Sequence, residues 1–186
     1  MSKLSRIIDT MKLIPRLGVC NVLAVAHYRY QWRSGALEKK LPASKAGEFV
    51  AFFQGESTHE ALGVAPALAT AITHRADALC DGKFLRFAEL EIDEGESPIW
   101  HKGIYAESAR KHFTHCAINA IAGEDIKLKW DLSRMHWAPQ LALAACISTG
   151  AARSRYLNRL NHLTHDWLAN NPYQTGANWA CGQEVS

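Results

Sequence analysis

The sequence predicts a mainly α-helical protein with a helical hairpin toward its C-terminal end and a few short extended segments. Apolar residues recur at helical spacing in four stretches, and only a Thr149-Gly150 turn separates the last two. The stretches that favour strands are only three or four residues long. A hydrophobic content of 48% and a charged content of 21% are typical of a chain that folds around a globular core.

The first predicted helix runs from Leu17 to Trp32 and ends at Ser34-Gly35. Its apolar residues lie near helical spacing, and the arginines close to its C-terminal end suit the negative end of the helix dipole. The next stretch, Ala43 to Gly63, mixes short apolar runs with glycine and serine. We expect it to be connective, with a helical turn or two near Glu48 to Phe53.

A second helix is predicted from Val64 to Leu79. This stretch is rich in alanine, has Pro66 in its first turn and is followed by Gly82. Beyond it the helical periodicity fades. The short apolar runs at 84–87 and 90–92 favour extended segments.

The C-terminal third predicts the hairpin. From Ala138 to Ile147 nearly every residue is apolar, which is typical of a helix buried on most sides, and Asp131 to Ser133 offers a cap for a turn before it. The next helix, Ala151 to Asn170, has one apolar stripe and is ended by Asn171-Pro172. The stripe consists of Tyr156, Leu160, Leu163 and Trp167, and the side chains expected off it, facing water, are Arg153, Arg155, Arg159 and Asp166.

The charge distribution limits the class of partner. A net charge of +3 and a pI near 8.6 favour the approach of an acidic polymer without requiring one. Lysines and arginines are scattered and form no run that resembles a nucleic-acid-binding arm, so we expect no nucleic-acid partner. No secretory signal is recognisable, and the apolar stretch Gly18 to Ala26 is far shorter than the ~20 residues of a membrane span. We expect no membrane span, and the sequence leaves cytoplasm and periplasm open.

The cysteines and histidines predict neither disulfides nor a metal site. The five cysteines are odd in number, widely spread and without a CxxC pair, so we expect buried free thiols. Four residues of one region could be drawn as a metal cluster, namely His101, His112, His115 and Cys116. Their spacing fits no standard zinc signature, so we expect them to be solvated or to satisfy loops, with no cofactor bound.

Several elements near the C-terminal end resemble one known family in their order and spacing. They are Lys-Trp-Asp-Leu-Ser-Arg-Met-His at 129–136, the apolar helix, Asp-Trp-Leu-Ala-Asn-Asn-Pro at 166–172, Gly-Ala-Asn-Trp at 176–179 and Gln-Glu-Val at 183–185. Together they look like the N-terminal region of the heparinase II/III-like polysaccharide lyases. The resemblance is specific over 129–186 and looser back to 83, and the segments 13–18 and 28–30 are similar to the leader of that family.

The fold that this resemblance implies is a partial α/α toroid of antiparallel helical hairpins. Residues 1–82 would form an N-terminal helical leader region, and residues 83–186 the first part of the toroid domain, incomplete at its C-terminal end. In the family an antiparallel β-sandwich follows the toroid, and the polysaccharide binds in the cleft between them. The missing C-terminal part of its own chain is therefore an expected partner of this one.

The implied reaction is β-elimination beside a uronic acid. The carboxylate is neutralised, a base removes the C5 proton and the O4 glycosidic bond breaks. In that family an Asn-Trp element with a following glutamate, here called the Asn-Trp-Glu element, starts the next helix. The family's neutralising Asn-His pair and catalytic tyrosine lie downstream of it, so the resemblance assigns no catalytic residue here. We therefore expect an N-terminal fragment, inactive alone, of a lyase that cleaves uronic-acid-containing anionic polysaccharide. The alternative is a non-catalytic glycan-binding or structural helical module.

Six residues are candidates for binding the sugar. Arginine can bind both oxygens of a sugar carboxylate, and an indole face suits the apolar side of a pyranose ring. The candidate substrate-binding residues are Trp130, Arg134, His136, Asn178, Trp179 and Glu184. Structural alternatives remain open, in which Trp130 and Trp137 anchor the core, Arg134 pairs with Asp131 or Glu184, Asn178 caps a helix and Trp179 fills the interior.

Overall fold

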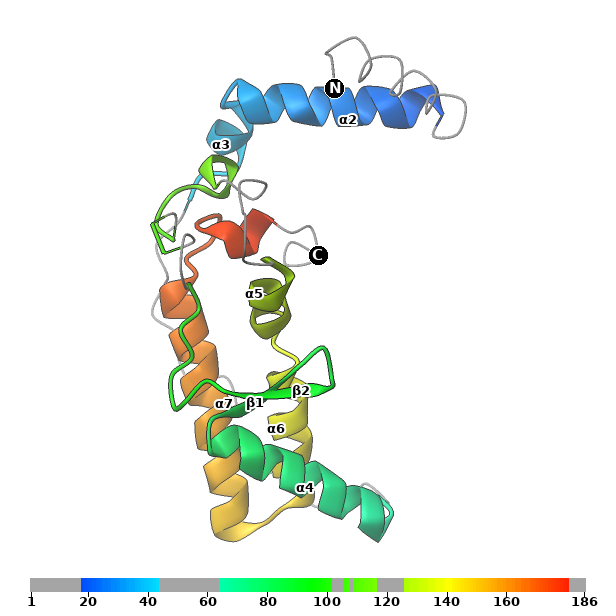
Figure 1. Cartoon of the computed structure of the whole chain (residues 1–186), viewed down its shortest axis with the longest axis vertical. Coiled ribbons are helices and arrows are strands. Elements are labelled where there is room, and N and C mark those ends of the chain that lie inside the picture. The colour runs from blue at the N-terminus through cyan, green and yellow to red at the C-terminus, as the bar shows by residue number, and fades with distance from the viewer. Residues whose placement is uncertain (1–17, 44–63, 102–105, 108, 117–125, 181–186) are drawn as a thin grey trace. The chain divides into compact units, whose positions relative to one another are not determined.

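A computed structural model describes residues 18–43, 64–101, 106–107, 109–116 and 126–180 (Figure 1). The protein is mainly helical, which confirms the predicted class, whereas the toroid stays a prediction. Within the described ranges, no helix combines the length and the apolar character that crossing a membrane would need. The chain divides into two compact units, Met1–Pro42 and Ala43–Ser186. The turns expected near Glu48 to Phe53 lie outside the described residues.

The described part of the first unit contains two helices, α2 (Val19–Arg33) and α3 (Ala36–Lys40). The bounds of α2 lie close to those predicted. Gly35 joins the two helices with a φ of 71°, in the left-handed region that glycine adopts without a steric penalty. None of the residues of α2 is buried, and α3 buries Leu37. The described part of this unit therefore has almost no core of its own.

The second unit is built around the predicted hairpin of α6 (Trp137–Ile147) and α7 (Gly150–Asn170), which lie side by side and are joined by a short turn (Figure 1). The third helix, α4 (Pro66–Cys80), packs against both of them. The apolar stripe of α7 faces this core as predicted, and the fully buried side chains of the core include Leu79, Phe84, Leu141, Leu160 and Leu163. The predicted division at residue 82 therefore runs between α4 and the helices it packs against.

Two short strands, β1 (Lys83–Arg86) and β2 (Leu90–Asp93), follow α4 and form an antiparallel hairpin. They match the two predicted extended segments. The turn between them contains Phe87 and Ala88, both at positive φ, which is uncommon for residues other than glycine. The backbone N–H of Phe87 donates to a carboxylate oxygen of Asp131 over 3.0 Å, and this bond holds the turn.

Asp131 lies on α5 (Ile126–Ser133), a helix for which the sequence indicated only a cap. Its carboxylate is buried and serves the strand turn, so it is not the partner of Arg134. After α7 the chain forms a short 3-10 helix, η3 (Ala177–Ala180), close to where a further helix was expected. A second 3-10 helix, η2 (Phe113–His115), is preceded by His112, which forms an antiparallel bridge with Thr175 before η3.

Arg159 does not face water, and the prediction for this residue is wrong. The side chain is buried on α7, and its guanidinium donates to the backbone carbonyl oxygens of Leu79, Gly95 and Glu96. Burial lowers the pKa of this guanidinium, which remains charged because three carbonyl oxygens replace its water. Arg159 thereby fixes the segment after β2 against α7.

The expectation of buried thiols is wrong for two of the cysteines. Cys20 and Cys146 are exposed, Cys80 is half-buried and Cys116 is buried, and these four are free thiols. Cys146 lies on the apolar helix α6, where a cysteine was expected to be covered. It is exposed because the described residues cover α6 only on the sides that face α4 and α7.

Candidate functional site

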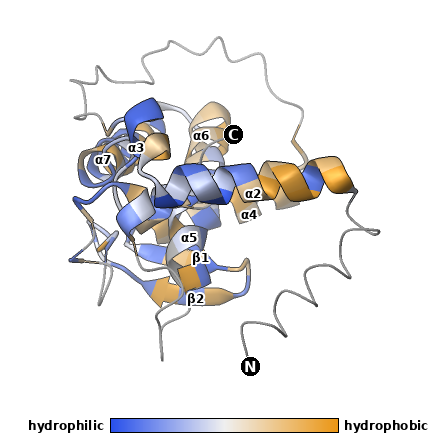
Figure 2. Cartoon of the chain, turned by 90° about the horizontal axis from the view of Figure 1, so that it is seen from above, coloured by the Kyte–Doolittle hydropathy of each residue, from blue (hydrophilic) through white to orange (hydrophobic). Residues whose placement is uncertain are grey.

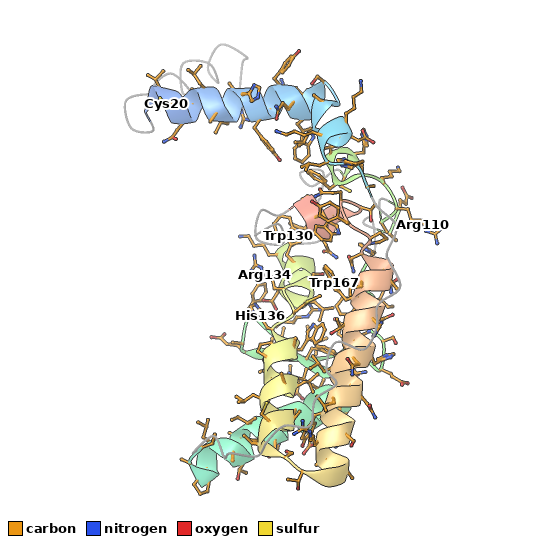
Figure 3. All side chains as sticks on the ribbon, turned by 180° about the vertical axis from the view of Figure 1, so that it is seen from behind. Cys20, Arg110, Trp130, Arg134, His136 and Trp167 are labelled. Carbon is orange, nitrogen blue, oxygen red and sulfur yellow. The ribbon has the colours of Figure 1, made fainter. Side chains whose placement is uncertain are left out.

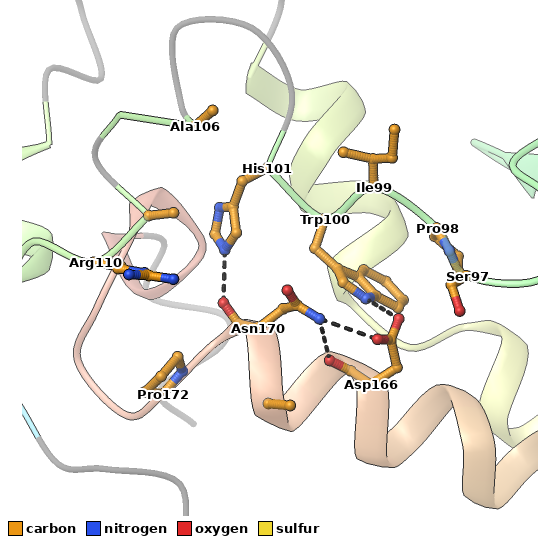
Figure 4. A pocket seen from close by; sticks show the side chains of 12 residues that line it. Ser97, Pro98, Ile99, Trp100, His101, Ala106, Arg110, Asp166, Asn170 and Pro172 are labelled. Atoms are coloured by element: carbon orange, nitrogen blue, oxygen red, sulfur yellow. Dashed lines mark hydrogen bonds between the residues drawn. The ribbon is translucent and has the colours of Figure 1, made fainter.

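A cavity of about 510 Å³ lies where the segment after β2 meets the C-terminal end of α7. Its size falls within the ~300–1,000 Å³ typical of small-ligand sites. Figure 4 shows the side chains around it. One wall is formed by the 97–101 segment and the opposite wall by residues 166–172, and Ala106, Ala109 and Arg110 close a third side.

Trp100 and Asp166 form the base of this cavity. The indole N–H of Trp100 donates to a carboxylate oxygen of Asp166 over 2.7 Å (Figure 4). The indole is 3% exposed and also contacts the ring of Trp137 in the core, with 6.4 Å between ring centroids. The carboxylate is therefore held in place by a side chain that the core itself immobilises.

Asn170 and His101 order the rim. The amide of Asn170 donates to the backbone carbonyl and to the carboxylate of Asp166, one turn earlier. The ring Nε2 of His101 lies 2.9 Å from the backbone carbonyl oxygen of Asn170, so Nε2 carries the proton and donates. At Gly176, whose φ is +77°, a Cβ would lie 2.9 Å from the His101 ring, so a larger residue would have to displace this imidazole.

Arg110 supplies a positive charge to the cavity. Its side chain is exposed, and it has no ion-pair or hydrogen-bond partner among the described residues. Figure 4 shows its guanidinium on the same side of the cavity as His101 and the carbonyl of Asn170, away from the Asp166 carboxylate. Pro98, Ile99 and Pro172 add apolar surface. The cavity thus offers a cation at one end, an anchored carboxylate at the other and apolar walls between them.

Such an arrangement suits a small polar ring that carries a carboxylate. A planar guanidinium pairs with both oxygens of a carboxylate, and an aspartate accepts hydrogen bonds from hydroxyl groups. Nothing in the sequence singled out Trp100, His101 or Arg110 for this role. Asp166, Asn170 and Pro172 do lie within the 166–172 segment that carries the resemblance.

Three of the predicted sugar-binding residues lie elsewhere, at α5 and at its turn into α6. Trp130 is half-buried and donates its indole N–H to the carbonyl of Ala177 over 3.0 Å, which ties α5 to η3. Arg134 and His136 are exposed on either side of Met135, whose φ of 56° bends the chain. Figure 3 shows these residues on one side of the view and Arg110 on the other. None of the three lines the cavity.

Two predicted residues of the last segment, Asn178 and Trp179, form hydrogen bonds within the protein. Asn178 is 2% exposed and donates its amide to the side-chain oxygen of Asn171 over 2.6 Å. The indole N–H of Trp179 donates to the backbone carbonyl of Asn171, and its ring contacts that of Trp167. Both side chains therefore serve the junction between α7 and η3. Glu184 lies outside the described residues.

Asn178 therefore does not cap a helix in the predicted way, although its role in this junction is structural. In the part of the chain that the structure describes, Arg134 has neither Asp131 nor any other ion-pair partner. Trp137 is a core anchor, with 3% of its surface exposed. Trp130 combines a half-buried ring with a structural hydrogen bond.

A second cavity, of about 470 Å³, lies beside the end of α4 but offers less chemistry. Its two arginines are already engaged, since Arg155 pairs with Asp77 and Asp81 and Arg159 binds backbone carbonyls. Its thiol, Cys80, has a pKa that burial raises, which favours the unreactive protonated form. We therefore do not regard it as a nucleophilic site.

The four residues that could be drawn as a metal cluster have other partners. His101 binds Asn170, and the ring of His112 bonds to the hydroxyl of Thr114 over 2.8 Å. Within the described ranges, no group of three or more His, Cys, Asp or Glu side chains could hold a metal ion.

No protein-family model matches this chain, and no match to it was found among the curated proteins or the solved structures.

Proposed function

We propose that the chain binds a uronic-acid-containing anionic polysaccharide, as the N-terminal part of a polysaccharide lyase of the heparinase II/III-like kind that cleaves by β-elimination. The observation that carries this proposal is the cavity at the end of α7, where the guanidinium of Arg110, which has no partner among the described residues, lies opposite an anchored carboxylate. Arg110 would bind the carboxylate of one uronate residue. Asp166 would accept from its hydroxyl groups, and Ile99 and Pro172 would contact its ring.

Two features support this assignment. The segment 166–172 forms one wall of the cavity and is also part of the resemblance on which the lyase hypothesis is based. The exposed side chains of Arg134 and His136 provide a second place where an acidic polymer could bind. The proposal gives no residue of this chain a catalytic role, because the resemblance places the base and the neutralising pair downstream of the Asn-Trp-Glu element.

The alternative is a non-catalytic glycan-binding or structural helical module, and a separate observation favours its structural form. Asn178 and Trp179 use their polar atoms within the protein, and a groove-lining amide would instead be open to solvent. The structural form gives Arg110 no ligand. The charge of Arg110 therefore discriminates between the two functions.

The test is calorimetric titration of the whole chain with short oligosaccharides of alginate and of heparan sulfate. Arg110→Met removes the charge and keeps most of the stem, and a lost charge-assisted contact lowers affinity about tenfold to a hundredfold. Lys111→Met is the matched control, because Lys111 is the exposed neighbouring cation and does not line the cavity. Equal affinities of Arg110→Met and the unchanged chain would contradict the proposal.

Two further arms sharpen this test. Oligosaccharides with reduced carboxyl groups should bind weakly to the unchanged chain and to Arg110→Met alike, because they lack the group that Arg110 recognises. The absorbance of an unsaturated uronate should not rise when the chain is mixed with either polymer. A rise would overturn the placement of the chemistry outside this chain.

A further inference from the structure

The helix α2 carries an unusual concentration of exposed apolar surface. Five of the eleven large hydrophobic side chains exposed in the described residues lie on this one helix of 15 residues. They are Val19, Leu23, Val25, Tyr28 and Tyr30, each between 46% and 68% exposed. A concentration of exposed apolar side chains often marks a surface that binds a protein or a membrane.

The side chains of α2 are sorted along the helix and not around it. Val19 to Ala26 is apolar apart from Asn21, whereas the second half, His27 to Arg33, contains three aromatic residues and two arginines. Figure 2 shows this change as α2 passes from orange to blue along its length. The rings of Tyr28 and Trp32 pack edge to face, with 5.7 Å between centroids.

The first unit is also the basic part of the protein. It contains eight of the 21 Lys and Arg residues but only two of the 18 Asp and Glu residues, so the remainder of the chain is acidic. Arg29, Arg33, Lys39 and Lys40 follow the apolar half of α2 and are exposed. An anionic surface would therefore attract this unit and not the other.

The order apolar, aromatic, basic matches the layers of a lipid surface. Valine and leucine side chains prefer the acyl region, tyrosine and tryptophan the boundary, and arginine and lysine the anionic headgroups. The eight residues of Val19 to Ala26 rise only about 12 Å, against about 30 Å of hydrocarbon, so the helix would enter one leaflet without crossing it.

Other occupants fit this pattern less well. A nucleic acid binds through phosphates and has no group for the apolar half of α2. Two antiparallel copies of α2 would set the apolar half of each against the arginines of the other, and two parallel copies would bring the arginines together. We propose that α2 binds the surface of an anionic lipid bilayer, with its first two turns in the acyl boundary and its arginines at the headgroups.

The proposal is independent of the sugar-binding function, and co-sedimentation of the whole chain with vesicles tests it. We expect binding to phosphatidylcholine vesicles that contain phosphatidylglycerol, weaker binding to phosphatidylcholine alone, and partial release by salt. Leu23→Asp should weaken binding about tenfold to a hundredfold, since it removes a leucine side chain that the acyl region of the bound vesicle would bury. The matched control is Leu68→Asp, which changes a similarly exposed leucine of α4 and should have no effect.

The charges are tested separately. Exchanging both Arg29 and Arg33 for glutamine should weaken binding to the anionic vesicles about thirtyfold. The same change at Lys83 and Lys111, two exposed lysines of the second unit, removes equal charge and should have little effect. The proposal would be overturned if the chain does not bind anionic vesicles, or if Leu23→Asp leaves that binding unchanged. It would also be overturned if the chain does not bind vesicles but forms a dimer that Leu23→Asp dissociates.

Discussion

The helices α2 and α7 are both long and regular, but they differ in what holds them. α7 buries a full stripe of side chains against α4 and α6, whereas α2 buries none within the described residues. Most helices in proteins owe their stability to packing and not to intrinsic propensity. α7 therefore belongs to the cooperative core, whereas the described residues provide no such packing for α2.

The largest expected effect tests this difference. Leu160 is 0% exposed at the centre of the core, and Leu160→Ala should lower the free energy of unfolding by about 2 to 5 kcal/mol. Leu23→Ala makes the same chemical change on α2, where the side chain is 63% exposed, and should have almost no effect. Urea denaturation of both variants measures the two values. Similar losses would show that α2 is packed as tightly as α7.

A smaller effect is expected from the glycines that position the segment after β2. Gly82 and Gly95 both have positive φ, so alanine at either position costs about 1 to 2 kcal/mol. A Cβ at Gly82 would also lie 2.7 Å from the carbonyl oxygen of Gly95, whereas a Cβ at Gly95 meets open space. Gly82→Ala should therefore lower the free energy of unfolding by about 1 to 3 kcal/mol more than Gly95→Ala, because its methyl group overpacks this contact. Urea denaturation measures both losses. Equal losses would contradict this close approach.

The smallest effect concerns Tyr156, whose hydroxyl donates to Asp77 over 2.9 Å. Burial, together with the hydrogen bond to Asp77, raises the pKa of Tyr156 from 10.0 to about 12. The folded protein thus holds this proton more tightly than the unfolded chain, so the contribution to stability is complete below pH 10 and is lost as the pH rises toward 12.

Tyr156→Phe should lower stability by about 0.5 to 1.5 kcal/mol at neutral pH. It should also flatten the fall in stability between pH 10 and pH 12, which thermal unfolding across that range can follow. Tyr173→Phe is the control, since Tyr173 is exposed and lies outside the core. If the stability of Tyr156→Phe falls as steeply over this pH range as that of the unchanged protein, another group is responsible for the titration.

The sequence was most informative where one physical effect dominates. The apolar run of α6 and the stripe of α7 predicted the hairpin because helical periodicity and a two-residue connection allow few other arrangements. The short strands were predicted, but their pairing and the Phe87 turn were not. That turn depends on the carboxylate of Asp131, far along the chain, and local patterns contain no information about such a contact.

The site was less predictable than the fold. The exposure of Arg134 and His136 agrees with a binding role, and the burial of Asn178 favours the structural alternative. The cavity residues Trp100, His101 and Arg110 were missed, because they meet α7 only through tertiary packing. Arg159 was expected to be solvated, since nothing in a single sequence reveals that three backbone carbonyls replace its water.

The guanidinium of Arg159 has a consequence for how the second unit would come apart. One side chain joins the end of α4, the bend at 95–96 and the middle of α7, three stretches that are distant along the chain. None of them can separate without leaving an uncompensated charge in an apolar environment, and that penalty is large. Opening of the wall that carries Trp100 should therefore coincide with loss of the helical hairpin, and hydrogen exchange should give the same free energy of opening for amides in both regions.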